Sequence, residues 1–178
     1  MTVNGTDYQV VRLLGKGKGG YSYLVTDGEN AYVLKQIHHE PCDYYRFGDK
    51  LGAELRDYDI LKDAGVPMPR MIQVDRKAER ILKQYIPGPT VYDLVLSDRL
   101  DPECILQIRR LAERLCLHNL NIDYFPTNFV VTDQGLYYVD YECNPYDPKW
   151  SFENWGIQYW SKTETFLQYV SQREEENR

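Results

Sequence analysis

The sequence predicts an α+β protein with two lobes: an antiparallel sheet with one helix over residues 1–86, and a reduced, mainly helical lobe over residues 87–178. Three observations predict this class. β-rich runs fill most of the chain up to residue 37 and return over residues 70–86, with one stretch of helical spacing between them. Pro87-Gly88-Pro89 then breaks the chain, and longer helical patterns follow.

The first three strands are expected at residues 8–14, 21–25 and 31–37, where Val, Leu, Tyr and Ile are abundant. Gly15-Lys-Gly17-Lys-Gly-Gly20 joins the first two of them. A dinucleotide-binding glycine loop opens a helix, whereas this one opens a strand. That arrangement is typical of a glycine flap that folds over nucleotide phosphates. A flexible glycine-rich hairpin turn is the alternative.

Residues 49–63 have the spacing of a helix, with Leu51 and Tyr58 on its apolar side. Glu54 lies along this apolar stripe, where a carboxylate is costly unless it is paired. Lys35, on the third strand, is the expected partner. The alternatives are a boundary glutamate that reaches water and a lysine on an edge strand.

Further elements are expected in order along the chain. Strands are expected at 70–74 and 80–86 and a short helix at 91–96. A longer helix should begin with Asp101 as N-cap and run to about His118. The aromatic residues between 150 and 160 are expected to pack in the core, and the charged end of the chain to fray.

Asp123, Asn128 and Asp140 flank a predicted hairpin whose two β-rich runs are joined by Asp133-Gln-Gly135. Counting pairs back from this three-residue loop places Asn128 opposite Asp140. An amide oxygen beside a carboxylate, with Asp123 one loop away, is a set of hard ligands that suits Mg²⁺ and points to phosphoryl transfer. The alternative is that these side chains only cap turns.

The composition limits the class of partner. A net charge of −6 and a pI near 5.1 argue against nucleic acid, because neutralising phosphates requires a basic surface. The cysteines form no CxxC pair and the histidines have no zinc spacing. We find no basic leader and no apolar run long enough for a membrane span, and therefore expect a cytoplasmic protein.

Taken in order, these motifs resemble the protein-kinase-like phosphotransferases, especially compact bacterial members near aminoglycoside phosphotransferases, lipopolysaccharide kinases and small Bud-type and RIO-type kinases. The resemblance covers residues 10–142, approximately. Besides the glycine loop, Lys35 and Glu54, it rests on Ala64-Gly-Val-Pro-Met-Pro69, Tyr85-Ile-Pro-Gly-Pro-Thr90, Asp123-Tyr-Phe-Pro-Thr-Asn128 and Asp140-Tyr-Glu142.

The resemblance implies a protein-kinase-like fold with ATP and Mg²⁺ as cofactors. It implies a set of nucleotide-binding residues, in which the last three offer backbone groups to adenine: Gly15, Gly17, Gly20, Lys35, Gln84, Tyr85 and Ile86. It also implies a catalytic and metal-binding set: Asp123, Lys35 and Glu54, with Asn128 and Asp140 as the Mg²⁺ ligands.

The implied activity is ATP-dependent transfer of the γ-phosphoryl group to a hydroxyl of a small molecule or of a protein Ser/Thr, with Asp123 taking the proton. The loop Asn121-Ile122-Asp123 lacks the His and Arg of the kinase HRD motif, so activation-loop regulation is not expected. A catalytically weak pseudokinase scaffold is one alternative, and a β-rich binding domain without nucleotide is another. The acceptor and the oligomeric state are left open.

Overall fold

The structure is a computed structural model that describes residues 1–40 and 48–176. The chain divides into two compact units, residues 1–56 with 69–85 and residues 57–68 with 86–178. Residues 57–68 therefore group with the second unit, whereas the sequence analysis assigned them to the first lobe.

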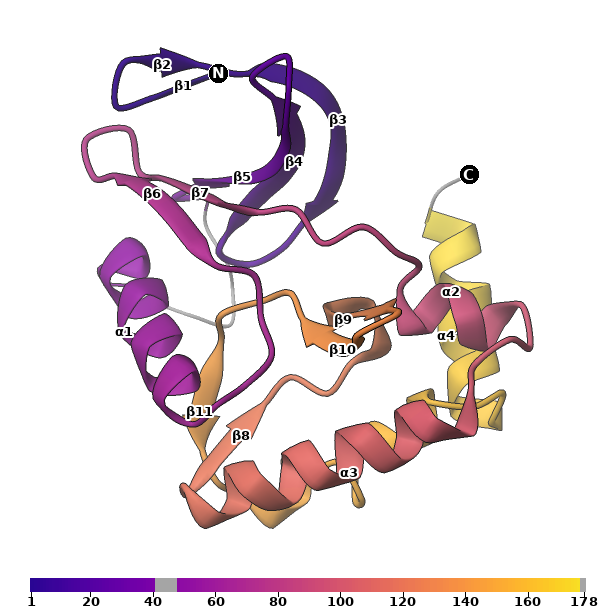
Figure 1. Cartoon of the computed structure of the whole chain (residues 1–178). Coiled ribbons are helices and arrows are strands. Elements are labelled where there is room, and N and C mark those ends of the chain that lie inside the picture. Colours follow the sequence, from indigo (N-terminus) through magenta and orange to yellow (C-terminus); the bar gives the residue numbers. More distant parts are fainter. Residues whose placement is uncertain (41–47, 177–178) are drawn as a thin grey trace. The chain divides into compact units, whose positions relative to one another are not determined.

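The first unit contains a five-stranded antiparallel sheet with the strand order β3-β4-β5-β7-β6 (Figure 1). The strands are β3 (Gln9–Lys16), β4 (Gly20–Thr26), β5 (Ala31–Ile37), β6 (Met71–Asp75) and β7 (Arg80–Gln84). A two-stranded ribbon of β1 (Thr2–Val3) and β2 (Thr6–Asp7) precedes them. The predicted antiparallel sheet is thus confirmed, although β1 and β2 were not foreseen because they are only two residues long.

A small core holds the first unit together. Val25, Leu34 and Leu82 from the sheet are fully buried against Val3 and Tyr8. Each buried aliphatic side chain of this size contributes about 1.5–3 kcal/mol relative to leaving it in water.

The helix α1 (Lys50–Asp63) forms where the apolar spacing predicted it. Asp49 precedes it, and its carboxylate accepts a hydrogen bond from the backbone N–H of Gly52 at 2.8 Å, as an N-cap does. The helix ends at Asp63. Gly65, two residues later, has φ +71°, and the N–H of Val66 donates to the carbonyl oxygen of Leu61 at 3.0 Å. This glycine C-cap lets the chain turn sharply toward Pro67.

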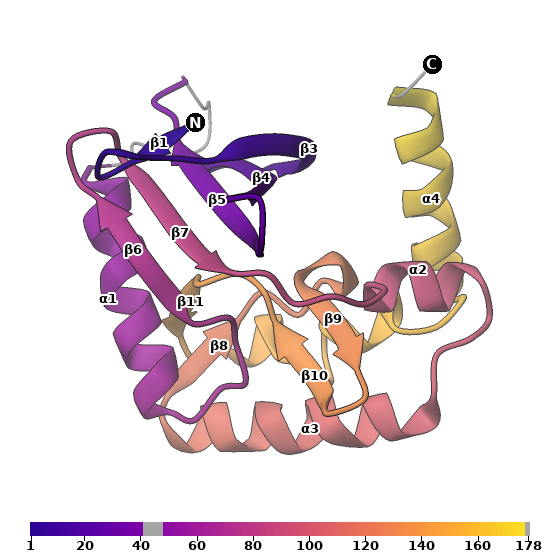
Figure 2. The same cartoon turned by 45° about the horizontal axis from the view of Figure 1, so that its top comes forward.

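Among the described residues, the second unit contains residues 57–63 of α1, three further helices and two small antiparallel ribbons. The helices are α2 (Val91–Leu96), α3 (Pro102–Leu117) and α4 (Glu164–Glu176). The ribbons are β8 (Leu120–Ile122) with β11 (Cys143–Pro145), and β9 (Phe129–Thr132) with β10 (Gly135–Tyr138). Short 3-10 helices lie at η1 (Pro126–Asn128), η2 (Pro148–Trp150) and η3 (Gly156–Tyr159). Figure 2 shows α3 running beside β8 and β10, which it contacts.

Local capping chemistry sets the starts of two of these helices. Thr90 and Asp93 form a reciprocal capping box at α2, in which each side chain accepts the other residue's backbone N–H at 3.1 Å. Asp101 accepts the N–H of Glu103 at 2.8 Å at the start of α3, and Pro102 occupies the first turn. The predicted N-terminus of α3 is therefore confirmed.

Aromatic side chains dominate the core of the second unit. Trp160, Tyr124, Phe152, Phe129 and Tyr138 are almost completely buried. Their rings meet at centroid distances of 5.1–5.8 Å, and the indole N–H of Trp160 donates to the carbonyl oxygen of Tyr124 at 2.8 Å. The prediction that the C-terminal aromatics pack in the core is confirmed for Phe152 and Trp160.

One expectation about the second unit needs correction. Residues up to 176 at the charged end of the chain belong to α4, whose inner face is anchored by buried Phe166, so the predicted frayed end is wrong for them. Residues 177–178 lie outside the described part. The coarse prediction of an α+β fold with an N-terminal antiparallel sheet and one helix is confirmed. Over residues 1–40 and 48–176, no helix is long and apolar enough to cross a membrane.

Candidate functional site

The first unit carries a nearly buried ion pair at its centre. Lys35 Nζ lies 2.7 Å from Glu54 Oε2, and the two side chains are only 12% and 9% exposed. Lys35 is on β5, which has β4 on one side and β7 on the other, so the edge-strand alternative is wrong. Glu54 comes from α1. The structure thus forms the pair that the sequence predicted.

Glu54 has a second carboxylate oxygen whose surroundings are unusual. Oε1 is buried and accepts no hydrogen bond from any residue that the structure describes. An unsatisfied buried carboxylate oxygen costs about 1–3 kcal/mol or more. The ion pair with Lys35, 2.7 Å away through Oε2, offsets part of this cost.

In the glycine loop between β3 and β4, the backbone carbonyl oxygens of three residues have polar partners. The N–H of Gly17 donates to the carbonyl oxygen of Gly20 at 2.9 Å and closes the hairpin. His38 Nε2 contacts the carbonyl oxygen of Gly17 at 3.1 Å. The ammonium of Lys50, a side chain only 7% exposed, donates to the carbonyl oxygen of Lys18 at 3.1 Å. These three contacts tie the backbone of the loop to its own hairpin, to His38 and to the first turn of α1.

The predicted glycines have different environments. A Cβ on Gly15 or Gly17 would meet no atom within 4 Å. A Cβ on Gly20 would lie 2.4 Å from the carbonyl oxygen of Gln36, so this glycine is required by the close approach of β4 and β5. Gly19, which the sequence analysis passed over, is the loop glycine beside Lys35: its Cβ would lie 3.7 Å from Nζ.

The residues predicted to meet adenine lie at and after the end of β7. The N–H of Gln84 donates to the carbonyl oxygen of Arg70 at 2.9 Å, so it is already used within the sheet. Tyr85 is the last residue of the first unit, and Ile86, 7% exposed, is the first residue of the following part of the second unit. Of the three, Gln84 is the least suited to offer its N–H to a ligand.

In the second unit, Asp123 and Asn128 lie at the two ends of one short loop. Asp123 follows β8, and its Oδ1 accepts the backbone N–H of Phe125 at 3.0 Å. The Asn128 side-chain NH₂ donates to the backbone carbonyl oxygen of Asp123 at 3.4 Å. Because the nitrogen end of the Asn128 amide points back to the loop, its oxygen end is the one suited to a metal ion.

Asp140 follows β10, and one of its oxygens accepts the backbone N–H of Tyr141 at 2.8 Å. The buried hydroxyl of Tyr138 donates to the carbonyl oxygen of Glu142 at 2.9 Å. Burial raises the pKa of Tyr138 well above its ordinary value, and the negative charges of Asp140, Asp123 and Glu142 raise it further. The Tyr138 phenol therefore lies in a negative electrostatic environment set by these carboxylates.

The register of the β9–β10 hairpin differs from the prediction. Gly135 pairs with Thr132, so the turn consists of Asp133 and Gln134 alone. The Thr132 hydroxyl donates to the Gly135 carbonyl oxygen and accepts the Gln134 N–H, both at 3.1 Å, which closes the shorter turn. The predicted pairing of Asn128 with Asp140 is therefore wrong.

Asn128 instead accepts the N–H of Val139 at 2.9 Å through its backbone carbonyl oxygen, and Asp140 lies one residue beyond that position. Within the described ranges, no group of three or more His, Cys, Asp or Glu side chains is gathered as a metal site. A magnesium ion would therefore rely on two protein ligands, Asn128 and Asp140, and on oxygens from water or phosphate, as Mg²⁺ commonly does.

Sequence reasoning missed the residues that shape the glycine loop. Lys50 occupies the first turn of α1, where acidic residues are favoured by the helix dipole. A lysine at this position was therefore a signal of a specific role. His38 follows β5 and carries no such signal, because its contact with Gly17 depends on the tertiary fold.

Comparison with known proteins gives a partial match. No protein-family model matches the chain. A Methanocaldococcus jannaschii protein described as a "probable bifunctional tRNA threonylcarbamoyladenosine biosynthesis protein" is 30% identical over 111 residues. The match covers 61% of this chain and 20% of that protein, so it spans about a fifth of the relative's length.

These findings correct the identification made from motifs. The assignment to the protein-kinase-like phosphotransferases is wrong by this comparison, because the matched protein is described by tRNA modification and no kinase family is found. The predicted transfer of phosphate to a small-molecule or Ser/Thr hydroxyl, and its pseudokinase alternative, are corrected with it. A few glycine, lysine, aspartate and asparagine positions indicate a chemistry, but they do not determine which reaction a protein serves.

Proposed function

We propose that this chain takes part in tRNA threonylcarbamoyladenosine biosynthesis as a component that binds a nucleoside triphosphate with Mg²⁺. The pathway comes from the partial relative. The nucleotide comes from the Lys35–Glu54 ion pair, which is the single observation that supports it most strongly. The finer fold assignment, a two-lobed protein-kinase-like fold, rests on the order of elements and stays a proposal.

The first unit would bind the phosphates. Lys35 is a positive charge fixed on the central strand by Glu54, 2.7 Å away, and Gly19 leaves space beside its ammonium. The carbonyl oxygens of Gly17 and Lys18 are taken up by His38 and Lys50, so the loop does not direct these oxygens at a phosphate. Positively charged groups and close backbone approach are what a polyphosphate requires.

The second unit, considered by itself, carries the residues that would hold a metal ion. The carboxylate of Asp140 and the side-chain oxygen of Asn128 are the hard donors that Mg²⁺ prefers. Asp123 is held by the N–H of Phe125 at 3.0 Å, and we assign it the role of orienting a water molecule for hydrolysis of the nucleotide. In that step water adds to the γ-phosphorus, the bond to the leaving diphosphate breaks, and the proton passes to the Asp123 carboxylate.

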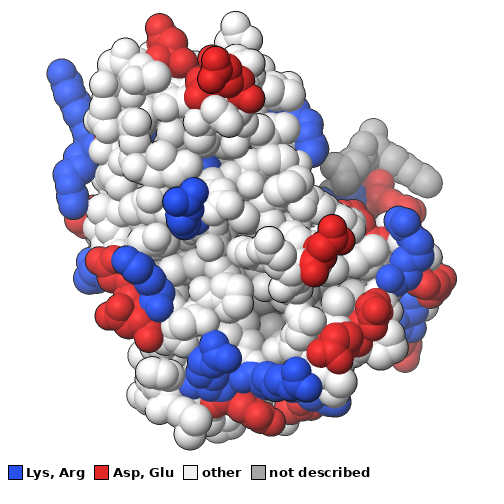
Figure 3. All heavy atoms as spheres, in the orientation of Figure 1, with Lys and Arg blue, Asp and Glu red and all other residues white. Residues whose placement is uncertain are grey.

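The charge of the chain favours this role over direct docking on tRNA. Basic and acidic side chains are interspersed on the face drawn in Figure 3, and the net charge is −6. A tRNA-binding surface would need a basic stripe. The prediction that nucleic acid is not a direct partner therefore stays part of the proposal.

Calorimetric titration with ATP, in the presence and absence of Mg²⁺, tests the nucleotide assignment. We expect Mg²⁺-dependent binding to the wild-type chain and at least about tenfold weaker binding to Lys35→Met and Asp140→Asn, since each removes one charge-assisted contact. Asp133→Asn, an exposed turn residue with the same chemical change, is the matched control and should bind normally. Equal affinity for wild type and both site variants would overturn the assignment.

A further inference from the structure

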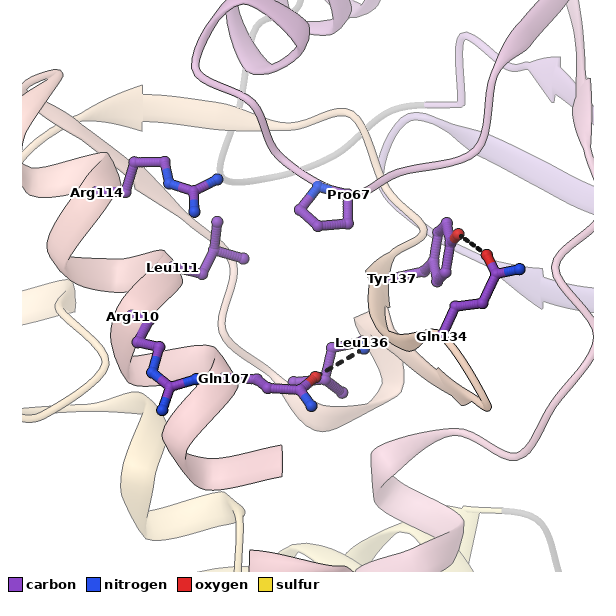
Figure 4. A pocket seen from close by; sticks show the side chains of 8 residues that line it. All are labelled: Pro67, Gln107, Arg110, Leu111, Arg114, Gln134, Leu136 and Tyr137. Carbon is purple, nitrogen blue, oxygen red and sulfur yellow. Dashed lines mark hydrogen bonds between the residues drawn. The ribbon is translucent and has the colours of Figure 1, made fainter. Parts of the chain in front are cut away.

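A concave site lies entirely within the second unit. A pocket of about 230 Å³ lies between α3 and the β9–β10 hairpin, beneath the loop that follows α1 (Figure 4). Its lining comes from these three segments: Pro67, Gln107, Arg110, Leu111, Arg114, Gln134, Leu136 and Tyr137. None of these residues belongs to the nucleotide-binding set proposed above.

The two glutamines of the lining each use their side-chain oxygen in a hydrogen bond. Gln107 Oε1 accepts the backbone N–H of Leu136 at 3.0 Å, and because an N–H can only donate, this fixes the orientation of the Gln107 amide. The Gln134 side-chain oxygen accepts the hydroxyl of Tyr137 at 3.1 Å. Each oxygen thus has one partner, and each side-chain NH₂ group can still donate a hydrogen bond to a ligand.

Two arginines one helical turn apart add positive charge. Arg114 is partly committed, since its Nη1 donates to the carbonyl oxygen of Gly65 at 2.9 Å. Arg110 contacts Glu103 at 3.6 Å, with side chains 69% and 50% exposed, and so exposed a pair contributes little. Arg110 can therefore exchange this contact for a ligand anion. None of the eight lining residues is acidic.

We propose that this pocket binds a small phosphate monoester. Guanidinium groups and amide N–H donors match phosphate oxygens, with arginine able to offer two parallel hydrogen bonds. Leu111, Leu136 and the ring of Tyr137 would contact the organic part of the ligand. The volume is smaller than that of pockets that hold drug-sized ligands, about 300–1,000 Å³, which favours a small ester over a bulky one.

Nuclear magnetic resonance of the side-chain NH₂ groups of Gln107 and Gln134 tests the proposal on the full chain, with glycerol 3-phosphate as probe. We expect both signals to shift and saturate, and glycerol to leave them unchanged. Arg110→Gln should weaken binding about tenfold, whereas Arg109→Gln should change it less than about twofold. Arg109 is the matched control because it lies on the same helix but pairs with Glu153 at 2.7 Å.

Unchanged signals with glycerol 3-phosphate would overturn the proposal. Equal weakening by Arg109→Gln and Arg110→Gln would also overturn it, because this would show general charge attraction. A titration with inorganic phosphate tells a site for phosphate monoesters from a site for free phosphate. Tighter binding of glycerol 3-phosphate than of inorganic phosphate supports a monoester site, and equal binding supports a site for free phosphate. Arg110→Gln should keep its affinity for Mg²⁺–ATP, so failure here leaves the proposed nucleotide function standing.

Discussion

The Lys35–Glu54 pair allows a prediction about stability that is separate from ligand binding. The Glu54 side chain is 9% exposed, and its Oε1 accepts no hydrogen bond among the described residues. Lys35→Met would also remove the partner of Oε2, so neither carboxylate oxygen would keep a partner. Removing one partner of a buried pair costs about 3–5 kcal/mol, and the remaining exposure places this case near about 3 kcal/mol. Replacing both residues, as Lys35→Met with Glu54→Leu, should bring the loss back to about 1 kcal/mol.

Urea denaturation followed by circular dichroism measures these differences in the free energy of unfolding. Lys62→Met, the same substitution at an exposed position on α1, is the matched control and should change stability by less than about 0.5 kcal/mol. The reasoning would be refuted if Lys35→Met cost less than about 1 kcal/mol, or if the double variant lost the sum of the two single losses. Either result would mean that the two side chains do not interact in the folded protein.

Two further predictions concern the glycine loop. Gly20→Ala should destabilise the chain by about 1–3 kcal/mol, because its Cβ would lie 2.4 Å from the carbonyl oxygen of Gln36. A Cβ on Gly17 would meet open space, so Gly17→Ala is the control and should change stability far less. The unfolding midpoints of the two variants in urea measure the difference. Lys16 Nζ lies 2.7 Å from Glu40 Oε2, and this contact lowers the pKa of Glu40 from 4.5 to about 2. The ionised Glu40 therefore stabilises the folded chain above pH 4.5, and this contribution is lost as the pH falls toward 2. Glu40→Gln should therefore be less stable than wild type at pH 7, with a difference in melting temperature that closes between pH 4.5 and 2; a difference independent of pH would contradict this.

Elements with a strong local pattern were predictable from the sequence. The sheet strands, α1, α2 and α3 have clear periodicity or caps, as in the Thr90–Asp93 box and the Asp101 N-cap. The Lys35–Glu54 pair was also predictable, because a carboxylate on an apolar helix face requires a partner.

Features that depend on tertiary contacts were not predictable. The ribbon of β8 and β11 joins three-residue segments far apart in the sequence, which show no periodicity of their own. The hairpin register was misjudged by one residue because the Thr132 hydroxyl stabilises a turn shorter than the one that the glycine suggested. The pocket beside α3 depends on hydrogen bonds that fix two glutamine side chains, which no sequence motif indicates.

The biological role required information beyond the residues of the site. A lysine held by a glutamate and an aspartate near an asparagine are compatible with many uses of a nucleotide. The partial match to a protein described by tRNA modification replaces phosphate transfer with tRNA modification as the proposed role. The binding of a nucleotide and Mg²⁺ by these residues is tested by the titrations proposed above.

The threonylcarbamoyladenosine content of tRNA tests the central claim most directly. It would be measured by mass spectrometry in cells that lack this gene and in the same cells carrying the wild-type chain, Asp140→Asn or the control Asp133→Asn. We predict that the modification is lost without the gene, restored by the wild type and by Asp133→Asn, and not restored by Asp140→Asn. Normal modification in cells that lack the gene would contradict the proposed role, and full restoration by Asp140→Asn would contradict the part assigned to Mg²⁺ and nucleotide.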